Sequence, residues 1–99
     1  MSRAENVVRP MHILLIEDNP ADVELARQCF CESRIPNEVH AAPNADTAFA
    51  FLRRTGQFRN APRPDLVLLD LNLPGIDGRE ILGAIKCDPG LQLIPVVVL

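Results

Sequence analysis

The chain has 99 residues, a length that fits one small domain. Its net charge of −3 gives no basic surface for nucleic acid, and no apolar stretch approaches the roughly 20 residues of a membrane-spanning helix. The first ten residues carry charge and lack the apolar core of a signal peptide. We therefore expect a cytoplasmic protein with a flexible N-terminal arm over residues 1–10, no membrane partner and no nucleic-acid partner.

The first element is a continuous apolar run over residues 12–16, which stops at two acids, Glu17 and Asp18. A run without polar alternation is typical of a parallel strand that helices cover on both faces. No phosphate-cradling glycines follow it, which argues against a dinucleotide or P-loop site. The strand therefore places two carboxylates at its carboxyl end, where open α/β sheets bind ligands.

A helix is expected next. Asn19 is a good N-cap, Pro20 suits the first helical position, and the apolar period continues to about Ser33. Its inward stripe is predicted to comprise Leu25, Ala26, Cys29 and Phe30. Cys29 is therefore interpreted as a small core residue. The spacing of the three cysteines matches neither a redox motif nor a zinc motif.

Residues 38–42 form a short, weakly apolar run, which we expect to be an edge strand. His40 within it and His12 in the first strand are interpreted as structural histidines. Asn44 caps a second helix. The inward positions of this helix are predicted to be Ala45, Ala48, Phe49 and Leu52. Phe51 lies beside that stripe, and we favour a half-buried core residue over a contact-surface residue.

A loop over residues 53–64 is begun by Gly56 at the helix C-terminus and closed by two prolines. It carries four arginines, of which those in the last helical turn suit the helix dipole. We favour a solvated surface for them. A docking patch for an acidic partner is the alternative.

The stretch from Asp65 to Gly78 carries the strongest signal in the chain. Its apolar first half predicts a buried central strand, and Asp70 appears where that run stops, ahead of a turn rich in proline and glycine. A third helix is expected over residues 78–86, with Ile81, Leu82 and Ile85 inward. A last strand is expected over residues 93–99. The alternation of strands and helices indicates a doubly wound, parallel α/β sheet.

Side by side, the first and third strands would bring together the carboxyl groups of Glu17, Asp18 and Asp70. Three carboxylates this close together repel each other, and this repulsion raises the pKa of each carboxyl group. A hard cation removes this repulsion, and Mg²⁺ accepts one or two carboxylates, a backbone carbonyl and several waters. The sequence therefore predicts a Mg²⁺ site with room for an anionic oxygen.

Two segments carry a family resemblance: Ile-Leu-Leu-Ile-Glu-Asp-Asn-Pro, which ends at Pro20, and the segment from Pro64 to Gly78. In their order and spacing they resemble the receiver domain of two-component response regulators, over residues 11–99. The resemblance implies a flavodoxin-like topology with strand order 2-1-3-4. It also implies a signalling phosphoacceptor rather than an enzyme.

The resemblance assigns roles to four residues. It implies that Asp70 is the phosphorylated aspartate and that Asp18, Asp70 and the backbone carbonyl of Asn72 bind Mg²⁺. Glu17 corresponds to the companion acid that holds metal waters. Because a glutamate is longer than the aspartate usual at that position, its carboxylate could also reach the metal directly.

The resemblance also implies a partner and an output. Receivers accept the phosphoryl group from a phosphohistidine of a sensor histidine kinase, and phosphorylation then changes their binding surface. The Asn-Pro-Ala-Asp opening of the first helix and the arginine-rich segment before Pro64 resemble the subgroup that serves phytochrome-type kinases.

The largest departure from the family lies at the C-terminus. Receivers continue with a Ser or Thr, a helix, a fifth strand that ends in Lys, and a final helix, and none of these follows Leu99. We therefore expect a receiver truncated after the fourth strand, as a fragment of a longer protein or as an edge-paired or domain-swapped homodimer.

Two other functions stay open. A pseudo-receiver would act as a non-phosphorylated interaction module. A metal-dependent phosphohydrolase would use similar acids, but it typically needs a second aspartate where Asn72 stands.

Overall fold

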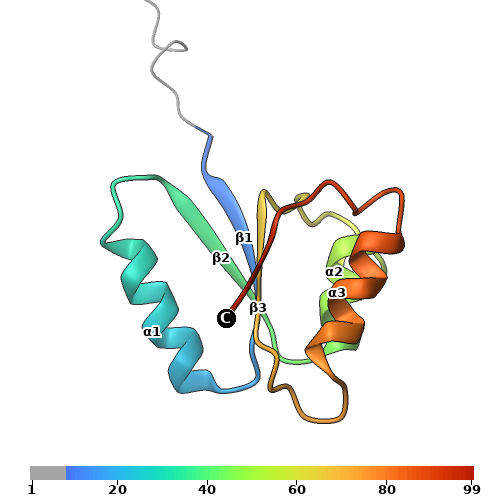
Figure 1. The fold of residues 1–99 in the computed structure, drawn as a ribbon. Coiled ribbons are helices and arrows are strands. Elements are labelled where there is room, and N and C mark those ends of the chain that lie inside the picture. Colours follow the sequence, from blue (N-terminus) through green and yellow to red (C-terminus); the bar gives the residue numbers. More distant parts are fainter. Residues whose placement is uncertain (1–8) are drawn as a thin grey trace, which may run out of the picture.

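The computed structural model describes residues 9–99, which form a four-stranded parallel sheet with strand order β2-β1-β3-β4. Helix α1 covers one face of the sheet, and α2 and α3 cover the other (Figure 1). The strands are β1 (Met11–Ile16), β2 (Asn37–Ala42), β3 (Leu66–Leu69) and β4 (Val96–Val98). The helices are α1 (Pro20–Cys31), α2 (Ala45–Arg53), the short 3-10 helix η2 (Gly56–Phe58) and α3 (Gly78–Cys87). The predicted α/β class and strand order are confirmed.

The centre of the sheet is apolar on both faces, as the continuous apolar runs predict. Residues 13–16 of β1 are at most 2% exposed. The face under α2 and α3 holds the larger cluster, which includes Leu14, Ile16, Val67, Leu69, Ile81 and Ile85. The face under α1 holds a smaller one, whose buried members are Ile13, Leu15 and Leu68. Most of the residues predicted for the arm, residues 1–8, lie outside the described part of the chain, so that boundary stays a prediction.

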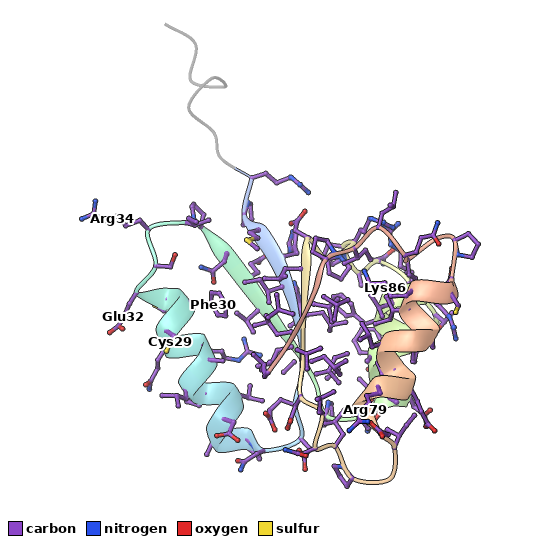
Figure 2. All side chains as sticks on the ribbon, viewed as in Figure 1. Cys29, Phe30, Glu32, Arg34, Arg79 and Lys86 are labelled. Atoms are coloured by element: carbon purple, nitrogen blue, oxygen red, sulfur yellow. The ribbon has the colours of Figure 1, made fainter. Side chains whose placement is uncertain are left out.

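The predicted inward stripe of α1 is confirmed at Ala26 and Phe30 and is wrong at Leu25 and Cys29. Leu25 is 59% exposed and Cys29 is exposed, whereas Val23, Ala26 and Phe30 pack on the sheet. Figure 2 shows Phe30 directed toward the sheet and Cys29 directed away from it. The helical period is confirmed, but the contact face of α1 includes Val23 and excludes Leu25 and Cys29. The helix also ends at Cys31, two residues before the predicted end.

In α2 the side chain of Phe51 is more buried than predicted, at 5% exposure. Its ring lies 5.5 Å from that of Phe58 and 5.0 Å from that of His40, between centroids. The residue that ends α2 is Arg54, in the left-handed conformation of the C-cap (φ 57°), and not Gly56 as predicted. Gly56 (φ 59°) instead opens η2.

The arginines around η2 are partly engaged within the chain. The Arg53 guanidinium lies 4.7 Å from the centroid of the Phe49 ring and 3.9 Å from an Asp88 carboxylate oxygen. Arg63 donates a hydrogen bond to the carbonyl of Gly90 at 2.8 Å. These contacts connect the loop to the end of α3. They do not distinguish between a solvated surface and a docking patch for an acidic partner.

Helix α3 packs as predicted, with Ile81 and Ile85 fully buried and Leu82 at the margin of the core. The last strand is shorter than the predicted 93–99, and Leu93 is 82% exposed. The segment before β4 is a turn in which the N–H of Ile94 donates to the Leu91 carbonyl, and the Lys86 ammonium donates to the carbonyls of Gln92 and Ile94. Within residues 9–99, no helix combines the length and apolar character that crossing a membrane requires.

Candidate functional site

The carboxyl ends of β1 and β3 meet at one edge of the sheet. Ile16 and Leu69 are paired in the parallel register, so the next residues, Glu17 and Asp70, leave the sheet side by side. The backbone N–H of Asp70 donates to the Ile16 carbonyl at 3.1 Å, which extends the pairing to the acids. The site is therefore anchored on the most buried part of the fold.

The structure brings together three of the four predicted site residues. One carboxylate oxygen from each of Glu17, Asp18 and Asp70 lies within 4.8 Å of the other two. We call these three residues the carboxylate cluster. Glu17 is 8% exposed, Asp70 is half-buried and Asp18 is exposed, so the cluster opens to solvent on one side.

Local hydrogen bonds orient two of these carboxylates. Asp70 Oδ1 accepts the backbone N–H of Asn72 at 2.9 Å, and Glu17 Oε2 accepts the backbone N–H of Asn19 at 3.1 Å. Asn72, the fourth predicted residue, is exposed in the turn and is thus linked to the cluster through its backbone. Asn19 also caps α1, as predicted, by accepting the N–H of Ala21.

Burial raises the pKa of Glu17 above its ordinary value, and the negative charge and side chain of Asp70 raise it further. The hydrogen bond from Asn19 acts in the opposite direction. A bound cation would relieve both the burial penalty and the repulsion. Because the three ligand atoms are all oxygens, the donor set fits hard ions such as Mg²⁺ or Mn²⁺.

The turn that follows Asp70 is held close to the start of α3. A Cβ atom on Gly78 would lie 2.7 Å from the Cα of Leu71 and 3.0 Å from the carbonyl oxygen of Asp70, distances that only glycine permits. Gly75, with φ at 82°, makes the left-handed bend of the same turn. The Asp77 side chain caps α3 by accepting the N–H of Arg79. The backbone around Asp70 is therefore fixed from both sides.

Sequence reasoning missed a second group of polar side chains. His12, Glu38 and His40, of which the histidines were interpreted as separate structural residues, lie together at the opposite end of β1 and β2. Strand pairing in the register His12↔Glu38 creates the group. The sequence contains no spacing signal for it, because β1 and β2 are separated by the whole of α1.

Comparison with known proteins identifies the family. The family model for the response regulator receiver domain matches residues 13–99. The response regulator Rcp1 of Synechocystis sp. is 49% identical over 90 residues, which cover 91% of this chain and 61% of the relative. The probable methanogenesis regulatory protein FilR2 of Methanothrix harundinacea is 41% identical over 91 residues, which cover 91% of this chain and 57% of the relative. The chain thus spans about three fifths of the length of these curated relatives.

Solved structures agree with this result. A structure described as the phosphorylated cyanobacterial phytochrome response regulator RcpA superposes with a TM-score of 0.84 at 50% identity, over 91% of this chain and 64% of that one. The Mn²⁺-bound form of Rcp1 gives 0.84 at 48% identity, over 90% and 64%. The bacteriophytochrome response regulator AtBRR gives 0.82 at 41% identity, over 92% and 66%. The resemblance to the phytochrome-associated subgroup is confirmed, and the chain belongs to the response regulator receiver domain family.

Proposed function

We propose that this chain is a phosphoacceptor in two-component signalling and that Asp70 receives the phosphoryl group. The observation that carries the proposal is the carboxylate cluster, in which Asp70 lies half-buried at the carboxyl end of β3 beside Glu17 and Asp18. Membership of the receiver family supports it. The site is an oxygen-lined edge of a parallel sheet, where open α/β sheets bind their ligands.

Asp70 is the nucleophile in this reaction. A carboxylate oxygen of Asp70 forms a bond to the phosphorus of a phosphohistidine, the P–N bond breaks, and its electron pair returns to the histidine ring of the kinase. The hydrogen bond from the Asn72 N–H to Oδ1 holds the carboxylate in a fixed orientation. The contribution of the protein is therefore mainly the positioning of the attacking oxygen.

Asp18, Asp70 and the backbone carbonyl of Asn72 would hold Mg²⁺, with Glu17 binding its waters or the ion itself. When bound, Mg²⁺ supplies positive charge that offsets the charge on the phosphoryl oxygens. The raised pKa of Glu17 supports this assignment, because burial and, to a lesser degree, the charge of Asp70 disfavour the Glu17 anion when no cation is bound.

We further propose a phytochrome-type sensor histidine kinase as the partner, since RcpA and AtBRR are described as phytochrome and bacteriophytochrome response regulators. Such signalling takes place in the cytoplasm. The acyl phosphate adds negative charge and strong hydrogen-bond acceptors beside the β3–α3 turn, and the resulting change of binding surface is the output. The homodimer suggested by the sequence stays a prediction.

The test is the intact mass of the protein after incubation with acetyl phosphate and Mg²⁺. We expect one phosphate adduct in the wild type and none in Asp70→Asn. Glu80→Gln, which removes an exposed acid in the first turn of α3, is the matched control and should keep the adduct. Chelation of Mg²⁺ should prevent the reaction.

Two results would contradict the proposal. An adduct that survives in Asp70→Asn would place the phosphate elsewhere. A folded wild type with no adduct, from acetyl phosphate or from a phosphorylated phytochrome-type kinase, would favour the pseudo-receiver that acts as an interaction module. Continuous release of phosphate from a phosphomonoester would instead indicate a hydrolase.

A further inference from the structure

The second group of polar side chains lies at the amino-terminal ends of β1 and β2, on the face of the sheet that α2 covers. His12 is paired with Glu38 across the two strands, and His40 follows Glu38 by two residues, so all three side chains project from the same face. We call these three residues the histidine cluster. Glu17 follows His12 by five positions, a distance of roughly 16 Å along an extended strand. The histidine cluster is therefore separate from the carboxylate cluster.

Three ligand atoms converge in the histidine cluster. His12 Nδ1 lies 3.1 Å from His40 Nε2 and 3.2 Å from Glu38 Oε2, and one ligand atom from each residue lies within 4.8 Å of the other two. A tetrahedral zinc ion with ligands at about 2.05 Å holds its ligand atoms roughly 3.3 Å apart. The two short distances are thus close to those of a metal site.

Hydrogen bonding alone accounts poorly for this convergence. His12 Nδ1 carries at most one proton, and it faces both the lone pairs of Glu38 and the Nε2 atom of His40. If His12 donates to Glu38, the contact with His40 lacks that proton. If His40 donates to His12 instead, the Glu38 carboxylate faces a nitrogen lone pair. A cation at the centre satisfies all three atoms at once.

The histidine cluster is open to solvent on one side and is held in place by neighbouring residues on the other. The side chain of His12 is 14% exposed, whereas that of Glu38 is 57% exposed. The His40 ring packs on Phe51, which in turn packs on Phe58, so its orientation is fixed by the core. The backbone N–H of His12 is held by the Asp65 carboxylate at 2.8 Å. The His40 ring and the His12 backbone are thus held by contacts within the protein, and the exposed glutamate lies on the solvent side.

We propose that His12, Glu38 and His40 bind a divalent transition-metal ion of the zinc type, with water in the remaining position. Two imidazoles and one carboxylate suit Zn²⁺, whereas Mg²⁺ prefers oxygen ligands alone. The two clusters therefore select different ions, a borderline-soft ion at one end of β1 and a hard ion at the other. This proposal does not depend on phosphorylation of Asp70.

The test is calorimetric titration of the full chain with Zn²⁺. Saturating Mg²⁺ occupies the carboxylate cluster, and a background with serine at Cys29, Cys31 and Cys87 removes the exposed thiols, which would otherwise bind zinc. We expect one equivalent of Zn²⁺ in this background. Glu38→Gln and His40→Gln should each weaken binding by at least about tenfold, since the loss even of an outer-shell partner costs roughly 10- to 100-fold.

Glu32→Gln is the matched control, because it removes an exposed acid close in the chain but outside the cluster, and it should bind Zn²⁺ like the background. Zn²⁺ should also shift the imidazole proton resonances of both histidines. The proposal is overturned if the background binds no Zn²⁺, or if both variants bind it unchanged. Should His40→Gln fail to fold, Glu38→Gln decides alone, because its side chain is largely exposed.

Phosphorylation of Asp70 and Zn²⁺ binding by the histidine cluster can be tested independently. In the background without cysteines, Asp70→Asn should bind Zn²⁺ as tightly as the background itself does, and Glu38→Gln should still accept one phosphate from acetyl phosphate. Loss of Zn²⁺ binding in Asp70→Asn would show that the ion binds the carboxylate cluster, and the inference drawn from the histidine cluster would then be wrong.

Discussion

The two ends of β1 carry two groups of ligand atoms, and the strands supply them by different means. At the carboxyl end, Glu17, Asp18 and Asp70 come from the residues that follow the strands. At the amino end, His12, Glu38 and His40 belong to the strands themselves. The carboxylate cluster therefore depends on where the strands stop, whereas the histidine cluster depends on the register between them.

The acids at the two ends of the sheet also affect folding stability in opposite directions. Glu17 is a buried acid whose pKa is raised, so its charge opposes folding in the absence of a cation. Asp65, at the other end of the sheet, accepts the backbone N–H of His12 at 2.8 Å, and this bond lowers its pKa. The acid at one end of the sheet thus lowers the stability of the metal-free protein, and the acid at the other end raises it.

The largest expected effect concerns the turn after Asp70. Gly78→Ala would place a methyl group against the Leu71 backbone and the Asp70 carbonyl, so the turn must shift. We expect a loss of about 1–3 kcal/mol in the free energy of unfolding, measured by urea denaturation, together with weaker Mg²⁺ binding. Gly83→Ala, where a Cβ meets nothing within 4 Å, is the control. Unchanged Mg²⁺ affinity in Gly78→Ala would mean that the turn does not position the carboxylate cluster.

A smaller effect is expected at Glu17. Because the folded pKa of this acid is raised, the stability of the metal-free protein should fall as the pH rises from 4.5 through that value, and the penalty is complete above it. Glu17→Gln should therefore stabilise the metal-free protein at pH 7 and weaken its Mg²⁺ binding. Thermal unfolding with and without Mg²⁺ measures both. A variant that is less stable at neutral pH without metal would contradict this account.

The smallest effect is expected at the exposed ion pair of Asp65. Its pKa is lowered from 3.8, by the hydrogen bond from the His12 N–H first and by Arg9 to a lesser degree. The stabilisation is therefore present above about pH 3.8 and disappears as the pH falls through the lower, folded pKa. Asp65→Asn should make the stability depend less on pH between pH 5 and roughly pH 2, whereas Glu24→Gln, which removes an exposed acid of α1, is the control and should not. Parallel profiles for Asp65→Asn and the wild type would exclude this role.

Much of the carboxylate cluster could be predicted because its determinants are local. An apolar run that stops on an acid marks the end of a buried strand, and Asn19 and Asn44 mark the helix starts that the structure confirms. The histidine cluster could not be predicted, since nothing local in the sequence sets the register His12↔Glu38. The prediction for α1 was wrong at Leu25 and Cys29 for a related reason: an amphipathic period is local, but the rotation of a helix on a sheet is set by packing.

The strand order also has a consequence for how the domain assembles. The contact between His12 and His40 joins residues that are 28 positions apart in the chain. The hydrogen bond between His12 and Asp65, which lies just before β3, joins residues that are 53 positions apart. A loop of twice the length costs only about 0.6 kcal/mol more to close, so entropy favours the shorter closure slightly. Synthesis from the N-terminus adds to that preference, because β2 leaves the ribosome well before β3. The contact between His12 and His40 can therefore form first in the nascent chain, and Asp70, the proposed phosphoacceptor, reaches Glu17 and Asp18 only when β3 docks.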